Sequence, residues 1–297
     1  MENYTRSQPA TLESEKARYM TVVDVICYTM IAIIALFNLG AIIIILCTTK
    51  LQKAPKYITI INLSMVMLVL GLFVLMGQHA NFVHLSASLY YYTNLFHFLC
   101  MGCIISLCVV LNVDYIMRIV KPTIYEGNKK FALLVALLFT VYCINALLIV
   151  PLYIDTYALV RESGSMLIRT TNPQYESIIV ILSVIPQTAF VLITGVLAIV
   201  VYLGYRKSQL DTPTPLELLV TDTVVVLLAN IPPVLKYLLP LNFASLPMAL
   251  TVWLLPFLLP TILPLNWLLD KDYRHSFRDL VLCRCRKTRD TDSYEMM

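Results

Sequence analysis

The chain has 297 residues, 59% of them hydrophobic and 13% charged, with a formal net charge of +4. A water-soluble domain of this length needs far more charge to cover its surface, so the composition excludes an ordinary soluble protein. The apolar residues fall in blocks of roughly 20, the length with which a helix crosses the hydrocarbon core of a bilayer. A backbone in lipid must satisfy its own hydrogen bonds, and the runs are continuous rather than alternating, so we expect helices and not a β-barrel.

Seven such blocks predict an all-α membrane protein, a seven-transmembrane helix bundle with a short amphipathic cytoplasmic helix after the seventh span. The predicted spans are 21–48, 57–77, 90–117, 131–153, 176–203, 216–239 and 248–269. Residues 1–20 then form an extracellular N-terminal segment, 21–269 the membrane domain, and 270–297 the cytoplasmic helix and tail. Prolines inside the last block, such as Pro260, predict kinks rather than an end, because neighbouring helices can satisfy the carbonyls that they free.

The lysines and arginines of the short loops predict the orientation of the chain. Most of them lie on one side, for example Lys50 and Lys53 after the first span and Lys129 and Lys130 before the fourth. Cytoplasmic loops carry the excess of positive charge, so we expect a multi-pass protein of the plasma membrane with its N-terminus outside. An outward N-terminus also fits the tripeptide N-Y-T, which makes Asn3 a candidate for N-glycosylation.

The third span ends in LNVDYIMRIVKP, residues 111–122, where an acid and a base follow a long apolar run. Asp114 and Arg118 are four residues apart and share one face of a helix. The spacing therefore predicts an ion pair at the cytoplasmic mouth of the bundle. From the charges alone, ordinary anchoring at a membrane edge is an equal alternative.

Seven spans, an outward N-terminus and the pattern D-x-x-x-x-I-x-K-P after the third span resemble rhodopsin-like (class A) G protein-coupled receptors, and fish odorant receptors look most similar. Asp114 stands at the acid of the family's acid-arginine-tyrosine triplet, but Tyr115 occupies the arginine position. Pro264 resembles the proline of the family's N-P-x-x-Y motif, with Leu263 at the asparagine position and Trp267 at the tyrosine position. The polar network that relays activation in the family is therefore largely replaced.

The resemblance implies a set of residues for coupling and switching. Arg118, one turn below Tyr115, is expected to take over the ionic role, with Asp114 or Asp222 as its partner at rest. An ionisable group at membrane depth is a functional candidate by default, although Asp222 could also lie near the headgroups. The coupling and switch set is Asp114, Tyr115, Arg118, Asp222, Pro264 and Trp267.

The resemblance also implies a ligand pocket that opens to the outside between the third, fifth, sixth and seventh helices. Its lining is mostly apolar and aromatic with a few polar groups, which is the usual composition of a small-molecule site. No carboxylate stands at position 97, which argues against a biogenic amine. His97 could equally be a histidine bonded within the bundle. The matching positions are His97, Phe98, Met101, Ile178, Leu182, Asn230, Pro233, Tyr237, Trp253 and Phe257.

After the last span, the segment DYRHSFRDLVLC is expected to form an amphipathic helix along the membrane, with Tyr273 and Phe277 on its lipid side. Cys283 and Cys285 follow it and look like palmitoylation sites, which would add a second anchor. The alternative is that both are inert thiols.

The function that the resemblance implies is a receptor that transmits binding of a small extracellular ligand, an odorant first of all, to a heterotrimeric G protein. The expected partners are that ligand, the G protein and the bilayer, with no nucleic acid, cofactor or metal. Motifs such as H-E-x-x-H and G-x-S-x-G do not occur, so we do not expect an enzyme. Two alternatives stay open. One is a divergent receptor of the orphan or viral type, with constitutive or no signalling, and the other is a small membrane transporter.

Overall fold

The protein is described by a computed structural model that covers residues 8–77, 87–121, 123, 129–163, 180–206, 216–238 and 255–282, and nearly all of these are helical. Five helices in these ranges are long and apolar enough to cross a membrane. They are Thr21–Cys47, Pro55–Leu75, Leu95–Val120, Lys129–Pro151 and Ile185–Gly204. The prediction of a helical membrane protein is confirmed at this level.

The elements follow the predicted order. They are α1 (Gln8–Cys47), α2 (Thr49–Gln52), α3 (Pro55–Leu68), η1 (Val69–Leu75), α5 (Ala87–Val120), α6 (Lys129–Ser163), η3 (Val180–Val184), α9 (Ile185–Arg206), α10 (Leu216–Leu238), η4 (Leu255–Leu258), α12 (Leu259–Asn266), η5 (Trp267–Leu269) and α13 (Lys271–Val281). Helix α10 covers nearly the whole of the predicted sixth span, 216–239, but is not one of the five helices given above. The predicted seventh corresponds to a shorter apolar stretch, Leu255–Leu269, so the count of seven spans stays a prediction.

The first helix begins earlier than the predicted span. Its backbone is helical from Gln8, whereas the apolar block begins near Thr21. The additional turns carry the sequence TLESEKARY, in which glutamate, lysine, alanine, leucine and arginine are good helix formers. Local propensity therefore extends the helix beyond the part that hydrophobicity marks.

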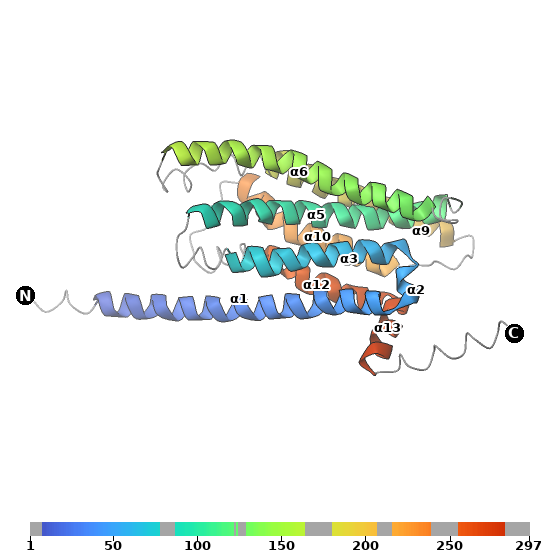
Figure 1. Cartoon of the computed structure of the whole chain (residues 1–297), viewed down its shortest axis with the longest axis horizontal. Coiled ribbons are helices and arrows are strands. Elements are labelled where there is room, and N and C mark those ends of the chain that lie inside the picture. The colour runs from blue at the N-terminus through green and yellow to red at the C-terminus, as the bar shows by residue number, and fades with distance from the viewer. Residues whose placement is uncertain are drawn as a thin grey trace, which may run out of the picture.

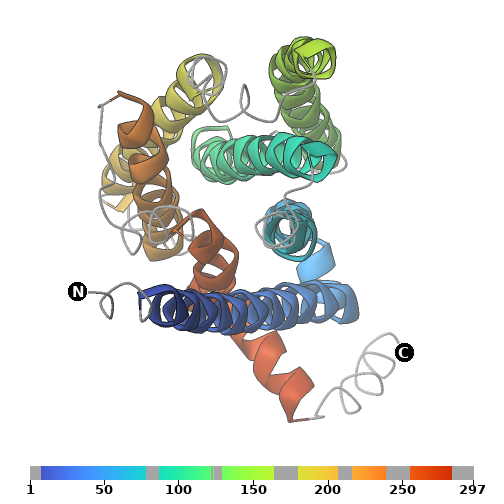
Figure 2. The same cartoon turned by 90° about the vertical axis from the view of Figure 1, so that its left-hand side faces the viewer.

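The long helices lie side by side with nearly parallel axes, and α13 turns away from that direction beside the end of α1 (Figure 1). Seen from one end, the helices surround α5, which contacts α3, η1, α6, α9 and α10 (Figure 2). Leu95–Val120 of α5 and Pro55–Leu75 of α3 and η1 are each 61% buried in their most apolar stretch, against 28% for α1 and 22% for α6. The segment of α5 and the segment of α3 and η1 are thus the two interior elements, while the outer helices present large apolar side chains such as Leu147 to the surroundings, as lipid contact requires.

A buried side-chain amide joins α1 to α12. Pro264 has no N–H, so it leaves the carbonyl of Pro260, four residues earlier in α12, without its helical donor. Asn38 of α1 donates to that carbonyl with an Nδ2–O distance of 2.8 Å. Its side chain is 0% exposed. The asparagine therefore satisfies the group that the proline frees, which is how membrane helices tolerate prolines.

Two further asparagines join helices around α5. Asn112 of α5 donates to the hydroxyls of Thr194 in α9 and Thr223 in α10, both at 3.3 Å. Asn145 of α6 donates to Ser106 of α5 at 3.2 Å. Because lipid offers no competing partner, such hydrogen bonds between helices hold a bundle together.

A glycine makes room for a further contact of Asn145. Gln187 of α9 donates to Asn145 of α6 at 2.8 Å, directly over Gly102 of α5. A Cβ at this glycine would overlap the Asn145 side-chain oxygen and lie 3.3 Å from Oε1 of Gln187. Small residues at helix interfaces are what permits such close approach in membranes.

We therefore predict that Gly102→Ala destabilises the bundle by about 1–3 kcal/mol, since the added methyl group must push the two amides apart. Thermal unfolding of the detergent-purified protein measures this effect. Gly40→Ala in α1 is the matched control, because a Cβ there meets nothing within 4 Å. It should be neutral or mildly stabilising. Equal melting temperatures for the two variants would contradict the close packing at Gly102.

Candidate functional site

One end of the bundle, here called the basic end, is formed by the end of α1, α2, the start of α3, the end of α5, the start of α6 and α13 (Figure 1). Its exposed cations are Lys50, Lys53, Lys121, Lys129 and Lys271, with Arg274 and Arg278 on α13. Among the described residues, four charged side chains inside this end form two ion pairs that the bundle shields from water. They are Lys56, Asp114, Arg118 and Asp270.

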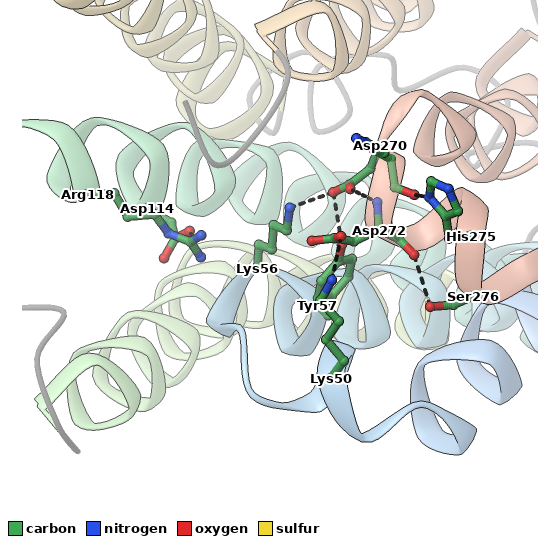
Figure 3. A network of polar contacts seen from close by, with 10 residues as sticks. Lys50, Lys56, Tyr57, Asp114, Arg118, Asp270, Asp272, His275 and Ser276 are labelled. Carbon is green, nitrogen blue, oxygen red and sulfur yellow. Dashed lines mark hydrogen bonds and ion pairs between the residues drawn. The ribbon is translucent and has the colours of Figure 1, made fainter. Parts of the chain in front are cut away.

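Asp270 joins the last helical turn of the membrane stretch to the start of α3. It is the N-cap of α13 and its Oδ1 accepts the backbone N–H of Asp272 at 3.0 Å. Its other oxygen accepts from Nζ of Lys56 at 2.5 Å and from the hydroxyl of Tyr57 at 3.0 Å (Figure 3). The Lys56 and Asp270 side chains are only 6% and 4% exposed. The pair is therefore a buried ion pair whose carboxylate accepts two further hydrogen bonds, and loss of either partner would leave the other as an unpaired buried charge.

A second ion pair holds α13 from outside. Nζ of Lys50 lies 2.9 Å from Oδ1 of Asp272, with side chains 75% and 44% exposed. The hydrogen bond from Lys50 lowers the pKa of the Asp272 carboxyl. This contribution to stability is present at neutral pH and is lost as the pH falls through that lowered pKa. Solvent screens the pair, so it contributes far less than its buried neighbour.

Arg118 and Asp114 form the ion pair that their spacing predicts. Nη2 of Arg118 lies 2.7 Å from Oδ2 of Asp114, and the side chains are 13% and 8% exposed. The sequence left Asp114 and Asp222 open as partners of Arg118, and the structure pairs Arg118 with Asp114. Asp222 is 3% exposed and accepts from Nδ2 of Asn266 in α12 at 3.3 Å. Its Oδ2 has no hydrogen-bond partner among the described residues.

A small pocket lies between the two buried ion pairs. Its lining includes Lys56 of α3, Asp114 and Tyr115 of α5, and Leu218 and Leu219 of α10. Lys56 and Asp114, each paired with another residue, therefore face one cavity. Three helices meet at this point, so a change in any one of them alters the surroundings of both charges.

The other predicted switch residues are also buried at this side of the bundle. Tyr115 is 2% exposed and Pro264 lies buried within α12. Trp267 is fully buried and packs edge to face on Tyr273, with 6.5 Å between ring centroids. The indole thus connects η5 to α13, next to Asp270.

Part of the predicted ligand set meets at the opposite half of α5. The ring of His97 lies 5.6 Å from that of Phe257 in η4 and 5.7 Å from that of Phe98. Phe257 and Met101 are buried, at 0% and 3% exposure. These side chains form an aromatic and apolar contact between the third and the last helical stretch.

The remaining predicted ligand positions are not joined to this contact by any described interaction. Asn230 is buried and donates to the carbonyl of Val226 in its own helix at 2.7 Å. Leu182 of η3 is 56% exposed. Pro233 and Tyr237 belong to the helical backbone of α10, but their side chains are outside the described part. Ile178, Trp253, Asn3, Cys283 and Cys285 lie outside the described residues.

Sequence reasoning missed the Lys56–Tyr57–Asp270 cluster. One signal was available, since an aspartate directly before an amphipathic helix is a typical N-cap. No local pattern could reveal its partners, because Lys56 precedes Asp270 by 214 residues.

No protein-family model matches this chain, and no curated protein matches it.

We predict that Lys56→Met and Asp270→Asn each destabilise the protein by about 3–5 kcal/mol, because each leaves a buried group without its partner. The double variant should lose much less than the sum, since both charges are then gone. A double-mutant cycle on thermal unfolding in detergent measures the coupling.

The exposed pair Lys50–Asp272 is the matched control for this cycle. Lys50→Ala and Asp272→Asn should show a coupling of only about 0–1 kcal/mol, since both side chains reach solvent. A coupling between Lys56 and Asp270 as small as that of the exposed pair would refute a structural role for the buried one.

Proposed function

We propose that the chain is a divergent rhodopsin-like receptor with seven spans in the plasma membrane and an extracellular N-terminus. It transmits the binding of a small extracellular ligand, with odorants as the first class to test, to a heterotrimeric G protein. The basic end is then the cytoplasmic end, because cytoplasmic loops carry the excess of positive charge. The proposal rests on the resemblance of the sequence motifs and on the geometry of α5.

The single observation that carries the proposal is that α5 bears both candidate sites on one helix. It is 34 residues long, with His97 towards one end and Arg118 towards the other. At 1.5 Å per residue the two lie about 30 Å apart along the axis, close to the thickness of a bilayer core. Because α5 is one of the two most buried segments and contacts α3, α6, α9 and α10, a shift at one end of this helix changes the packing of its neighbours at the other end.

The ligand end is supported by the contact of His97 with Phe257. A ligand that inserts between these rings touches α5 and η4 at once, and so bears on the helix that carries Pro260 and Pro264. Prolines are the usual places where membrane helices bend. A ligand that binds one bend better than another shifts the population towards it, by no more than its difference in affinity.

The coupling end is supported by the buried pair Asp114–Arg118. With Tyr115 at the family's arginine position, Arg118 is the cation of α5 available to meet a G protein. In the described arrangement it is held by Asp114, so release of that ion pair is the step that would expose it.

A second candidate function is a receptor of the same fold that does not signal to a G protein. Tyr115 is 2% exposed and Arg118 is paired within the bundle, so neither is offered to a partner in this arrangement. A receptor that stays in this state would be silent, as the orphan-type alternative requires.

The test is expression in cells with cyclic-AMP and calcium readouts, screened against small odorants, amino acids and bile acids. We predict that Arg118→Gln changes basal or ligand-driven signalling severalfold at equal surface delivery, because it removes the charge that the proposed switch moves. Lys129→Ala, an exposed cation at the start of α6, should signal as the unchanged chain does.

The outcomes separate the two candidates. Silence across the screen, in both the unchanged chain and Arg118→Gln at normal surface levels, favours the non-signalling receptor. If Arg118→Gln signals as strongly as the unchanged chain, Arg118 takes no part in the switch.

A further inference from the structure

The two buried ion pairs at the basic end border one small pocket, with Lys56 from one pair and Asp114 from the other in its lining. Lys56 contacts Asp270 and also lines the pocket into which Asp114 faces. Tyr57 donates its hydroxyl to Asp270 and so holds the same carboxylate as Lys56. Four charges of alternating sign, Asp270, Lys56, Asp114 and Arg118, thus lie around this pocket as two neighbouring ion pairs. Figure 3 shows Asp114 and Arg118 to one side of Lys56. We call these four residues the charge cluster.

The charge cluster constrains what happens when Arg118 leaves. A buried carboxylate that loses its cation is costly, so Asp114 must recruit another positive group or take up a proton. Within the described part of the basic end, Lys56 is the cation that lines the same pocket as Asp114. A lysine has a flexible four-carbon stem and three donors, so its ammonium can turn from one carboxylate to another with little change in the backbone.

We propose that Lys56 is a positioning residue shared by two carboxylates, and that it moves from Asp270 to Asp114 when Arg118 is drawn away. Asp270 then keeps only Tyr57 and its own N-cap bond, and the start of α13 loosens. The state of Arg118 on α5 is in this way transmitted to the helix that follows the last span.

The route to α13 is direct because Asp270 is itself the N-cap of that helix. The other charged anchor, Lys50–Asp272, is exposed and therefore weak. Loss of the Lys56 contact should consequently be visible in the amides of Lys271–Val281. The inference rests on the proposed function only in that a docking G protein would be what draws Arg118 away. The exchange of charge partners needs no ligand and no G protein.

The experiment is amide hydrogen exchange of the detergent-purified full chain at pH 8, followed by mass spectrometry of peptides from α13. Arg118→Gln leaves Asp114 to compete for Lys56, so the amides of α13 should exchange several times faster than in the unchanged chain. Asp114→Asn added to Arg118→Gln removes the competing carboxylate, so exchange should return to the original rate. Arg118→Met should give the same result as Arg118→Gln, so the test does not depend on the correct folding of a single variant.

Two controls fix the scale. Lys56→Met gives the rate for an α13 that has lost Lys56 altogether, and Arg118→Gln should approach it. Lys50→Ala should speed exchange by the same factor whether or not Arg118 is present, because its bridge lies outside the charge cluster.

Unchanged exchange of the α13 amides in both Arg118 variants would overturn the inference. It would also be overturned if adding Asp114→Asn failed to restore the original exchange rate. A signalling screen that finds no ligand would count against the proposed function alone. A normal signal with no change in α13 would count against the charge exchange alone.

Discussion

The absence of water from the interior of a bilayer governs this structure, since a buried backbone carbonyl or charged side chain can be satisfied only by partners within the bundle. The carbonyl of Pro260 receives the amide of Asn38 from a helix 222 residues away in sequence. Asn112 and Asn145 likewise reach across to neighbouring helices. Lys56 and Asp270 satisfy each other's charge at the basic end. A small number of polar residues thus fixes how helices with otherwise interchangeable apolar surfaces are arranged.

The same constraint explains which parts of the fold the sequence could predict. Long apolar runs gave the positions of the helices, because hydrophobicity and length alone decide whether a segment can cross lipid. The pairing of Asp114 with Arg118 was also predictable, since four residues on a helix define one face. The π-helical η1 was not predicted, nor was the early start of α1, because both depend on backbone preferences that hydrophobicity does not encode.

The candidate site was predictable only where its residues are local in sequence. The cluster of Lys56, Tyr57 and Asp270 brings together segments more than 200 residues apart, and a single sequence carries no signal for such a contact. The ligand-end residues were assigned by resemblance. Of these, His97, Phe98 and Phe257 meet, because α5 and η4 pass each other at that level.

The contact between Asn38 and Pro260 also has an evolutionary consequence. The amide at position 38 supplies the hydrogen bond that the proline at position 264, which has no N–H, cannot donate. If position 264 were occupied by any other amino acid, the helix could close its own hydrogen bond, and the buried amide would keep its bond to the carbonyl of Ile34 but lose its acceptor in α12. The two positions should therefore be inherited together, and homologous chains that have lost the proline should be those in which the asparagine has drifted to an apolar residue.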